Sequence, residues 1–128
     1  MLSQAPAQQR PPAAAVRAYG AIQSARSQRQ QEADVFAILA GRLRAALEDG
    51  GPIAAVRAAA DARRVFGAVE VQTLHPTCPL PTELRVLIAN VTRRALREVE
   101  QPDPDLAFLA AIADDFAAGL GARPGDPL

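Results

Sequence analysis

Apolar residues recur along most of this chain at spacings of three and four, which place side chains on one face of a helix. The strongest such stripe in the N-terminal half lies in residues 28–48 and consists of Val35, Leu39, Leu43, Ala46 and Leu47. A weaker stripe in residues 13–25 consists of Val16, Tyr19 and Ile22, and Gly20 lowers the helix propensity there. Valine, threonine and tyrosine form no alternating run, so the pattern predicts helices and no strand.

Residues that cap or break helices predict where the next boundaries fall. Ser27 is a candidate N-cap for the helix over 28–48, and the glycine pair at 50–51 is expected to end it. Pro52 then suits the first position of a third helix, because its φ is already helical and no N–H is needed there. This helix is predicted to run to about Leu74.

Three further apolar faces complete the helical pattern. The inner face predicted for residues 52–74 consists of Ile53, Val56, Ala59, Ala62, Phe66, Val69 and Thr73. A fourth helix, over about 82–100, carries Leu84, Ile88, Val91, Ala95 and Val99. A fifth begins at 103–105, where Asp103 is the expected cap and Pro104 the first residue, and its face consists of Leu109, Ile112, Ala113, Phe116 and Leu120.

Short connections between successive amphipathic helices favour antiparallel neighbours. The sequence therefore predicts an all-α fold, a small antiparallel helical bundle of about five helices in a single domain over residues 13–120. Residues 1–12 and 121–128 have too little apolar surface to order themselves, so they are expected to be flexible tails.

In the segment from 75 to 90, HPTCPLPTELRVLIAN, prolines are predicted to fix the backbone conformation just before the fourth helix begins. Pro79 and Pro81 restrict the chain to extended geometry, and Glu83 complements the helix dipole in the first turn. Leu80 is placed either to staple the turn onto the bundle or to project toward a partner. Cys78 has no evident role in this pattern.

The charge balance excludes a general electrostatic attraction to nucleic acid or anionic lipid, because the net charge is zero. All fourteen basic residues are arginine. The charges are unevenly distributed, since residues 57–97 carry a net charge of plus four and residues 98–128 a net charge of minus six. Such a positive middle and negative end can pair within one fold or meet a partner.

Catalytic and metal-binding patterns are absent from the sequence. There is no glycine-rich phosphate loop, G-x-S-x-G or H-E-x-x-H motif, and His75 and Cys78 are too few ligands for structural zinc. No apolar segment approaches the ~20 residues that span a bilayer. We therefore expect a reduced, cytoplasmic protein that is not an enzyme, has no cofactor and does not contact a membrane.

Two groups of residues allow more than one interpretation. Arg93, Arg94 and Arg97 could form an RNA-binding patch or a solvated face, and the absence of an exposed aromatic among them argues against direct nucleic-acid contact. Phe66 suits core packing better than a partner anchor, whereas Tyr19 could dock on the bundle or on a partner.

Several short motifs together resemble the FlaF family, flagellar biosynthesis regulators of alphaproteobacteria. They are Ala18-Tyr19-Gly20, Arg29 with Glu32-Ala33, Pro79-Leu80-Pro81 continuing through Glu83-Leu84-Arg85 to Ile88-Ala89-Asn90, and Ala118-Gly119-Leu120. The segment P-L-P-x-E-L-R is the specific part. Where the family tends to carry an asparagine and a tryptophan in its third helix, this chain has Ala62 and Phe66. Either Phe66 anchors a partner more weakly than the tryptophan of typical members, or the chain is a diverged paralogue.

The resemblance implies a non-enzymatic cytoplasmic protein that binds newly made flagellin as a secretion chaperone and works with FlbT, a second regulator. The residues assigned to partner binding on this basis are Tyr19, Phe66, Leu80, Leu84, Arg85 and Asn90. Two alternatives stay open, an RNA-binding translational regulator that uses the arginines of 57–97 and a structural helical subunit of a larger assembly.

Overall fold

The computed structural model describes residues 12–121, except for the side chain of Arg26, and within that range the chain forms four helices and no strand. The helices are α1 (Ala13–Asp49), α2 (Pro52–Leu74), α3 (Thr82–Val99) and α4 (Leu106–Gly121). The predicted all-α helical bundle is confirmed. The predicted tails, 1–12 and 121–128, lie outside the described residues except for Pro12 and Gly121, and Gly121 ends α4.

The first two predicted helices are one continuous helix of 37 residues, so the predicted boundary at Ser27 is wrong. Serine caps a helix only where the preceding backbone is not helical, and no proline lies between Ala13 and Asp49 to interrupt the hydrogen bonds. The predicted end of the helix is confirmed, because Gly50 has a φ of 73° and its N–H donates to the Ala46 oxygen at 3.0 Å. This left-handed conformation favours glycine.

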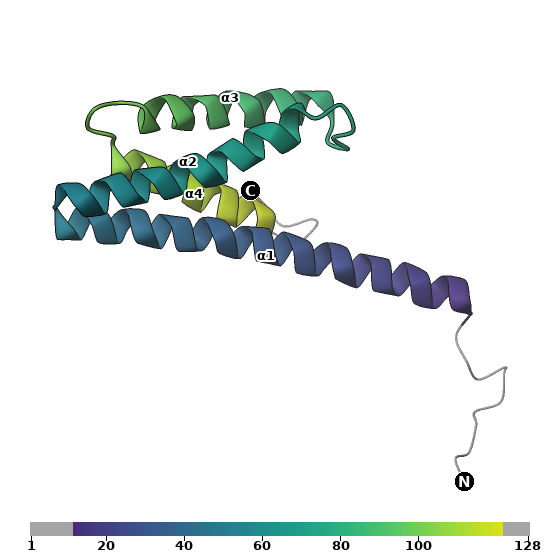
Figure 1. Cartoon of the computed structure of the whole chain (residues 1–128). Helices are drawn as coiled ribbons and strands as arrows, with labels where there is room; N and C mark the ends of the chain where they lie inside the picture. Colours follow the sequence, from purple (N-terminus) through teal and green to yellow (C-terminus); the bar gives the residue numbers. More distant parts are fainter. Residues whose placement is uncertain (1–11, 122–128) are drawn as a thin grey trace, which may run out of the picture.

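The helices pack as two antiparallel pairs that share one core (Figure 1). α1 lies along α4 and α2 along α3, and α2 also packs on the C-terminal half of α1. The N-terminal half of α1 continues beyond the other three helices (Figure 1). Among residues 12–121, one end of the longest helix therefore has no neighbouring helix.

Three phenylalanines form the centre of the core. Phe36 of α1 stacks on Phe116 of α4 with ring centroids 5.0 Å apart, and Phe66 of α2 lies 6.2 and 6.0 Å from these two rings. Alanine fills much of the remaining space, which lets the helices approach closely; the fully buried small residues are Ala62, Ala95, Ala110 and Ala113. The core thus joins α1, α2 and α4 through one aromatic cluster.

The predicted inner face of α2 is correct in its C-terminal part and wrong at its start. Phe66 and Thr73 are buried, whereas Ile53 and Val56 are each 68% exposed. At about 100° per residue, Ile53 lies on the opposite side of the helix from Ala62, which is buried. The true inner stripe begins at Ala58 instead.

The start of α4 also differs from the prediction. The helix begins at Leu106, and the Asp105 carboxylate accepts a hydrogen bond from the Phe108 N–H at 3.0 Å. The cap is therefore Asp105 and not Asp103. Glu98 of α3 accepts a hydrogen bond from the Asp105 N–H at 3.0 Å and so ties the turn to the preceding helix.

Candidate functional site

The residues assigned to partner binding do not converge on one site. Phe66 is 0% exposed and lies within the aromatic cluster, so it cannot serve as a surface anchor in this conformation. Its assignment to partner binding is corrected, and core packing is the role that the contacts show. A helical pattern could not decide this, because a core stripe and a partner stripe have the same periodicity.

Three of the assigned residues lie at the turn between α2 and α3. Leu80 and Leu84 are partly exposed there. Arg85 has a structural role, because its Nε donates to the Thr73 oxygen at 3.1 Å and its Nη2 to the His75 oxygen at 3.4 Å. The first bond satisfies a carbonyl group of the last turn of α2, which has no partner within the helix. The second adds to the hydrogen bond that the His75 oxygen accepts from the Cys78 N–H at 3.0 Å.

Asn90 lies further along α3, and Tyr19 lies on α1. Asn90 is exposed on α3. Tyr19 is 65% exposed on α1, between Val16 and Ile22, which are 53% and 56% exposed. These three α1 residues, the α1 stripe, are the apolar face predicted for residues 13–25, and within the described structure they are not covered by another helix (Figure 1).

The α1 stripe belongs to a longer exposed segment, residues 13–31, which we term the α1 extension. Every residue of it with a described side chain is exposed. Its charged residues are Arg17, Arg26 and Arg29, and it contains no acidic residue. An exposed apolar stripe in a basic segment is suited to a partner helix that is itself amphipathic.

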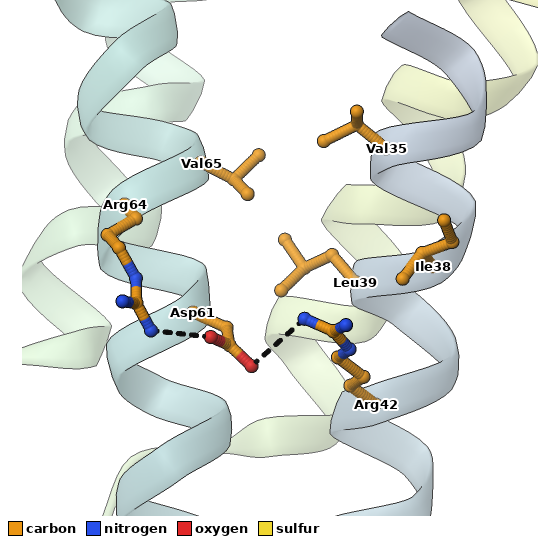
Figure 2. A pocket seen from close by; sticks show the side chains of 7 residues that line it. All are labelled: Val35, Ile38, Leu39, Arg42, Asp61, Arg64 and Val65. Carbon is orange, nitrogen blue, oxygen red and sulfur yellow. Dashed lines mark hydrogen bonds and ion pairs between the residues drawn. The ribbon is translucent and has the colours of Figure 1, made fainter. Parts of the chain in front are cut away.

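A second apolar surface lies between α1 and α2, about two-thirds of the way along α1 (Figure 2). This α1–α2 groove has a volume of about 480 Å³ and is lined by Val35, Ile38, Leu39, Arg42, Asp61, Arg64 and Val65. Figure 2 shows Val35 and Val65 facing each other across the groove, with Leu39 between the helices and the charged groups at one end. Sequence reasoning missed this site, because it depends on how two helices align.

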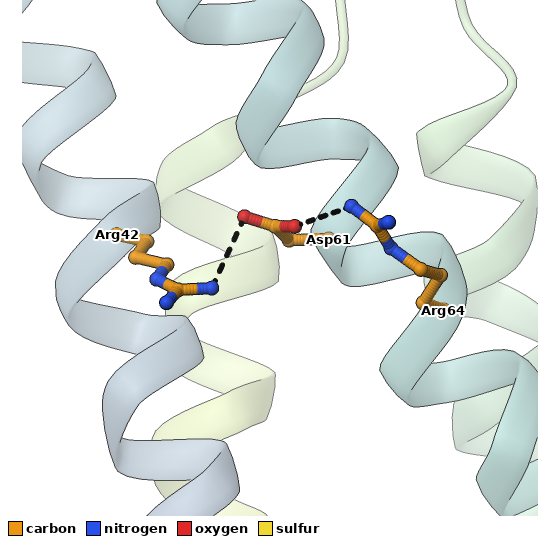
Figure 3. A network of polar contacts seen from close by, with 3 residues as sticks. All are labelled: Arg42, Asp61 and Arg64. Carbon is orange, nitrogen blue, oxygen red and sulfur yellow. Dashed lines mark hydrogen bonds and ion pairs between the residues drawn. The ribbon is translucent and has the colours of Figure 1, made fainter.

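The charged end of the groove holds two guanidinium groups and one carboxylate (Figure 3). Arg64 Nη2 lies 2.7 Å from Asp61 Oδ1, and Arg42 Nη1 lies 3.5 Å from Asp61 Oδ2. Asp61 is the least exposed of the three side chains. The network therefore carries a net positive charge beside an apolar surface.

The groove continues toward the α1–α2 turn as a second hollow of about 310 Å³ that shares Arg42 and Asp61. Its other lining residues are Ala45, Ala46, Asp49, Ala54, Arg57 and Ala58. The seam between the two helices is therefore hollowed over several turns, with small apolar residues along it.

The arginines of residues 57–97 mostly contact groups of the protein itself. Arg63 pairs with Glu100 at 3.0 Å, Arg93 with Glu70 at 3.8 Å, and Arg94 lies over the Phe108 ring, 5.5 Å from its centroid. Because Glu100 and Glu70 neutralise two of these cations, the attraction to an RNA backbone is lowered, which weighs against the RNA-binding interpretation.

One ion pair joins α1 to α4. Arg44 donates two hydrogen bonds to the carboxylate of Asp114, one of them at 3.2 Å. This contact holds the pKa of Asp114 below its usual range and raises the pKa of Arg44. The pair stabilises the docking of α4 on α1 wherever the carboxylate is ionised.

The described residues contain neither a metal-binding cluster nor a membrane-spanning helix. In residues 12–121 no three histidine, cysteine or acidic side chains are grouped so that they could hold a metal ion. No helix of this part of the chain has the length and apolar character that a membrane span requires.

Comparison with known proteins gives one match. The family model described as "Flagellar protein FlaF" matches residues 15–120, from the α1 stripe to the end of α4. Neither a curated protein nor a solved structure matches the chain. The α1 stripe and the α1–α2 groove both lie within the matched residues.

Proposed function

Because the chain belongs to the FlaF family of flagellar proteins, we propose that it acts in flagellar biosynthesis as a cytoplasmic secretion chaperone that binds unassembled flagellin. In this proposal it works together with a FlbT-type regulator. The observation that carries it is the exposed stripe of Val16, Tyr19 and Ile22 on the α1 extension.

The proposed binding mode is helix against helix. In this proposal the client segment is an amphipathic helix of unassembled flagellin, whose apolar face is covered until export. The α1 stripe offers three apolar side chains at helical spacing, and each contributes on the order of 1 kcal/mol when its exposed part is buried. A contact of this size can be released at export, which a secretion chaperone requires.

The test is co-expression of the protein with tagged flagellin from the same organism, followed by co-purification. We expect the unaltered protein to co-purify and the double variant Tyr19→Ser, Ile22→Ser to be lost from the complex. The matched control is Val71→Ser, Val86→Ser, which removes two apolar side chains that are also more than half exposed, on α2 and α3. Neither pair of changes should alter the unfolding midpoint, because none of the four side chains is in the core.

The salt dependence of the complex separates the alternatives. Apolar contact between helices should persist as salt is raised, whereas RNA binding through phosphate contacts weakens steeply. An RNA complex that dissociates with salt, together with no flagellin complex at any salt concentration, would replace the chaperone proposal by the RNA-binding alternative. Binding of neither would favour a structural subunit.

A further inference from the structure

We propose that the α1–α2 groove is a docking site for an acidic, aliphatic segment of a partner protein. An aliphatic side chain of that segment enters between Val35, Ile38 and Val65, and a neighbouring carboxylate binds Arg42 and Arg64. The groove is separate from the surface used in the proposed function, because Val35 lies roughly 20 Å along α1 from Ile22 at about 1.5 Å per residue.

The apolar part of the site is open to solvent. Val35 is 47% and Ile38 55% exposed, although both lie on the half of α1 that is packed in the bundle. Leu39 is almost fully buried and forms the floor (Figure 2). The volume of about 480 Å³ lies within the range of ligand sites, roughly 300–1,000 Å³.

The charged part of the site favours a partner segment with a negative charge. Asp61 supplies the only carboxylate among the lining residues, and both guanidinium groups share it. Each guanidinium has several N–H donors and can bind a carboxylate with two of them at once. Arg42 and Arg64 therefore retain donors for a second carboxylate, and Coulomb attraction favours an acidic segment over a basic one.

The same charges argue against a second copy of this chain that docks through its α1 extension. The charged residues of that extension are Arg17, Arg26 and Arg29. That surface would place cations against Arg42 and Arg64. The hollow that continues past Arg42 is lined by alanines together with Arg57 and Asp49, and it suits an elongated segment lying along the seam.

The proposal is tested with fluorescein-labelled, capped 18-residue peptides that carry leucine at helical spacings of three and four. One peptide has glutamate beside the leucines, a second has glutamine and a third has lysine at the same positions. Binding to the full-length protein is measured by fluorescence anisotropy at low and high salt. The contact is located from the methyl NMR signals of Val35, Ile38 and Val65.

We expect the glutamate peptide to bind most tightly and to shift these methyl signals. Its affinity should fall as the salt concentration is raised. Arg64→Gln should lower the affinity for the glutamate peptide about two- to five-fold. Asp61→Asn, which removes the competing carboxylate, should raise this affinity by a similar factor. Arg97→Gln is the charge control, because this arginine is exposed on α3 away from the groove.

Val35→Asn should weaken the binding of all three peptides. Val86→Asn, which changes an exposed valine of α3, should leave their binding unchanged. The proposal is overturned if the glutamate peptide does not bind, if Val35→Asn and Val86→Asn act alike, or if the shifts appear on the α1 stripe instead. It is also overturned if the protein dimerises and Val35→Asn dissolves the dimer, since the occupant is then a second copy. Because the peptide-binding experiment does not use flagellin, its result is independent of the co-purification test of the chaperone proposal.

Discussion

Phe66→Ala should cost about 3–5 kcal/mol of unfolding free energy, the range measured when a buried phenylalanine is truncated to alanine. The upper part of this range is expected here, because the side chain is 0% exposed and its ring contacts both Phe36 and Phe116. Three helices meet at these rings, so the cavity cannot close by the movement of one side chain. A domain of this size has only about 5–15 kcal/mol of stability, so the variant loses a large share of it.

The assay is urea unfolding followed by the helical circular dichroism signal. With a slope of about 2 kcal/mol per molar urea, a loss of 4 kcal/mol lowers the midpoint by about 2 M. The control is Val71→Ala on the same helix, which should change the stability by about 0.5 kcal/mol or less, because this valine is mostly exposed. If Phe66→Ala costs less than 1 kcal/mol but abolishes flagellin binding, the ring is a partner anchor and the core described above is wrong.

Two further predictions concern single positions on α1 and α4. Gly50→Ala should destabilise the protein by about 1–2 kcal/mol, because the φ of 73° is strained for alanine. Gly41→Ala should stabilise the protein by about 0.5–1 kcal/mol, because Gly41 lies inside α1 with open space around it. Both changes in stability are measured from the midpoints of urea unfolding. Asp114→Asn should destabilise the protein at neutral pH, and its difference from the unaltered protein should shrink as the pH falls. The pKa of Asp114 is lowered in the folded state by Arg44, so the contribution is complete above the unfolded pKa of about 3.9 and is lost progressively as the pH falls through the lower folded pKa. A difference that stays constant down to pH 2, or an equal pH dependence for the control Asp115→Asn, would contradict this.

Much of the fold follows from local patterns. The ends of α2 were predicted from Pro52 and from the break after Leu74, and both are confirmed because proline and the residues around it act within a single turn. The boundary at Ser27 failed for the opposite reason. A serine can cap a helix or continue one, and only the neighbouring backbone decides between them.

The sites were harder to predict than the helices. The spacing of Val16, Tyr19 and Ile22 was visible in the sequence, but nothing in it showed that these side chains are exposed in the described part of the chain. The α1–α2 groove was missed altogether, because Arg42 and Asp61 meet through the register between two helices, which a pattern along one helix does not contain.

The continuity of α1 has a consequence for how the exposed segment stays helical. A separate peptide of that length would have to form its first turn at a large entropic cost, and short helices are marginal in water for this reason. The packed half of α1 supplies that first turn permanently, so each residue of the extension adds one hydrogen bond to an existing helix. A partner that binds Val16, Tyr19 and Ile22 therefore meets a preformed surface and avoids the nucleation cost.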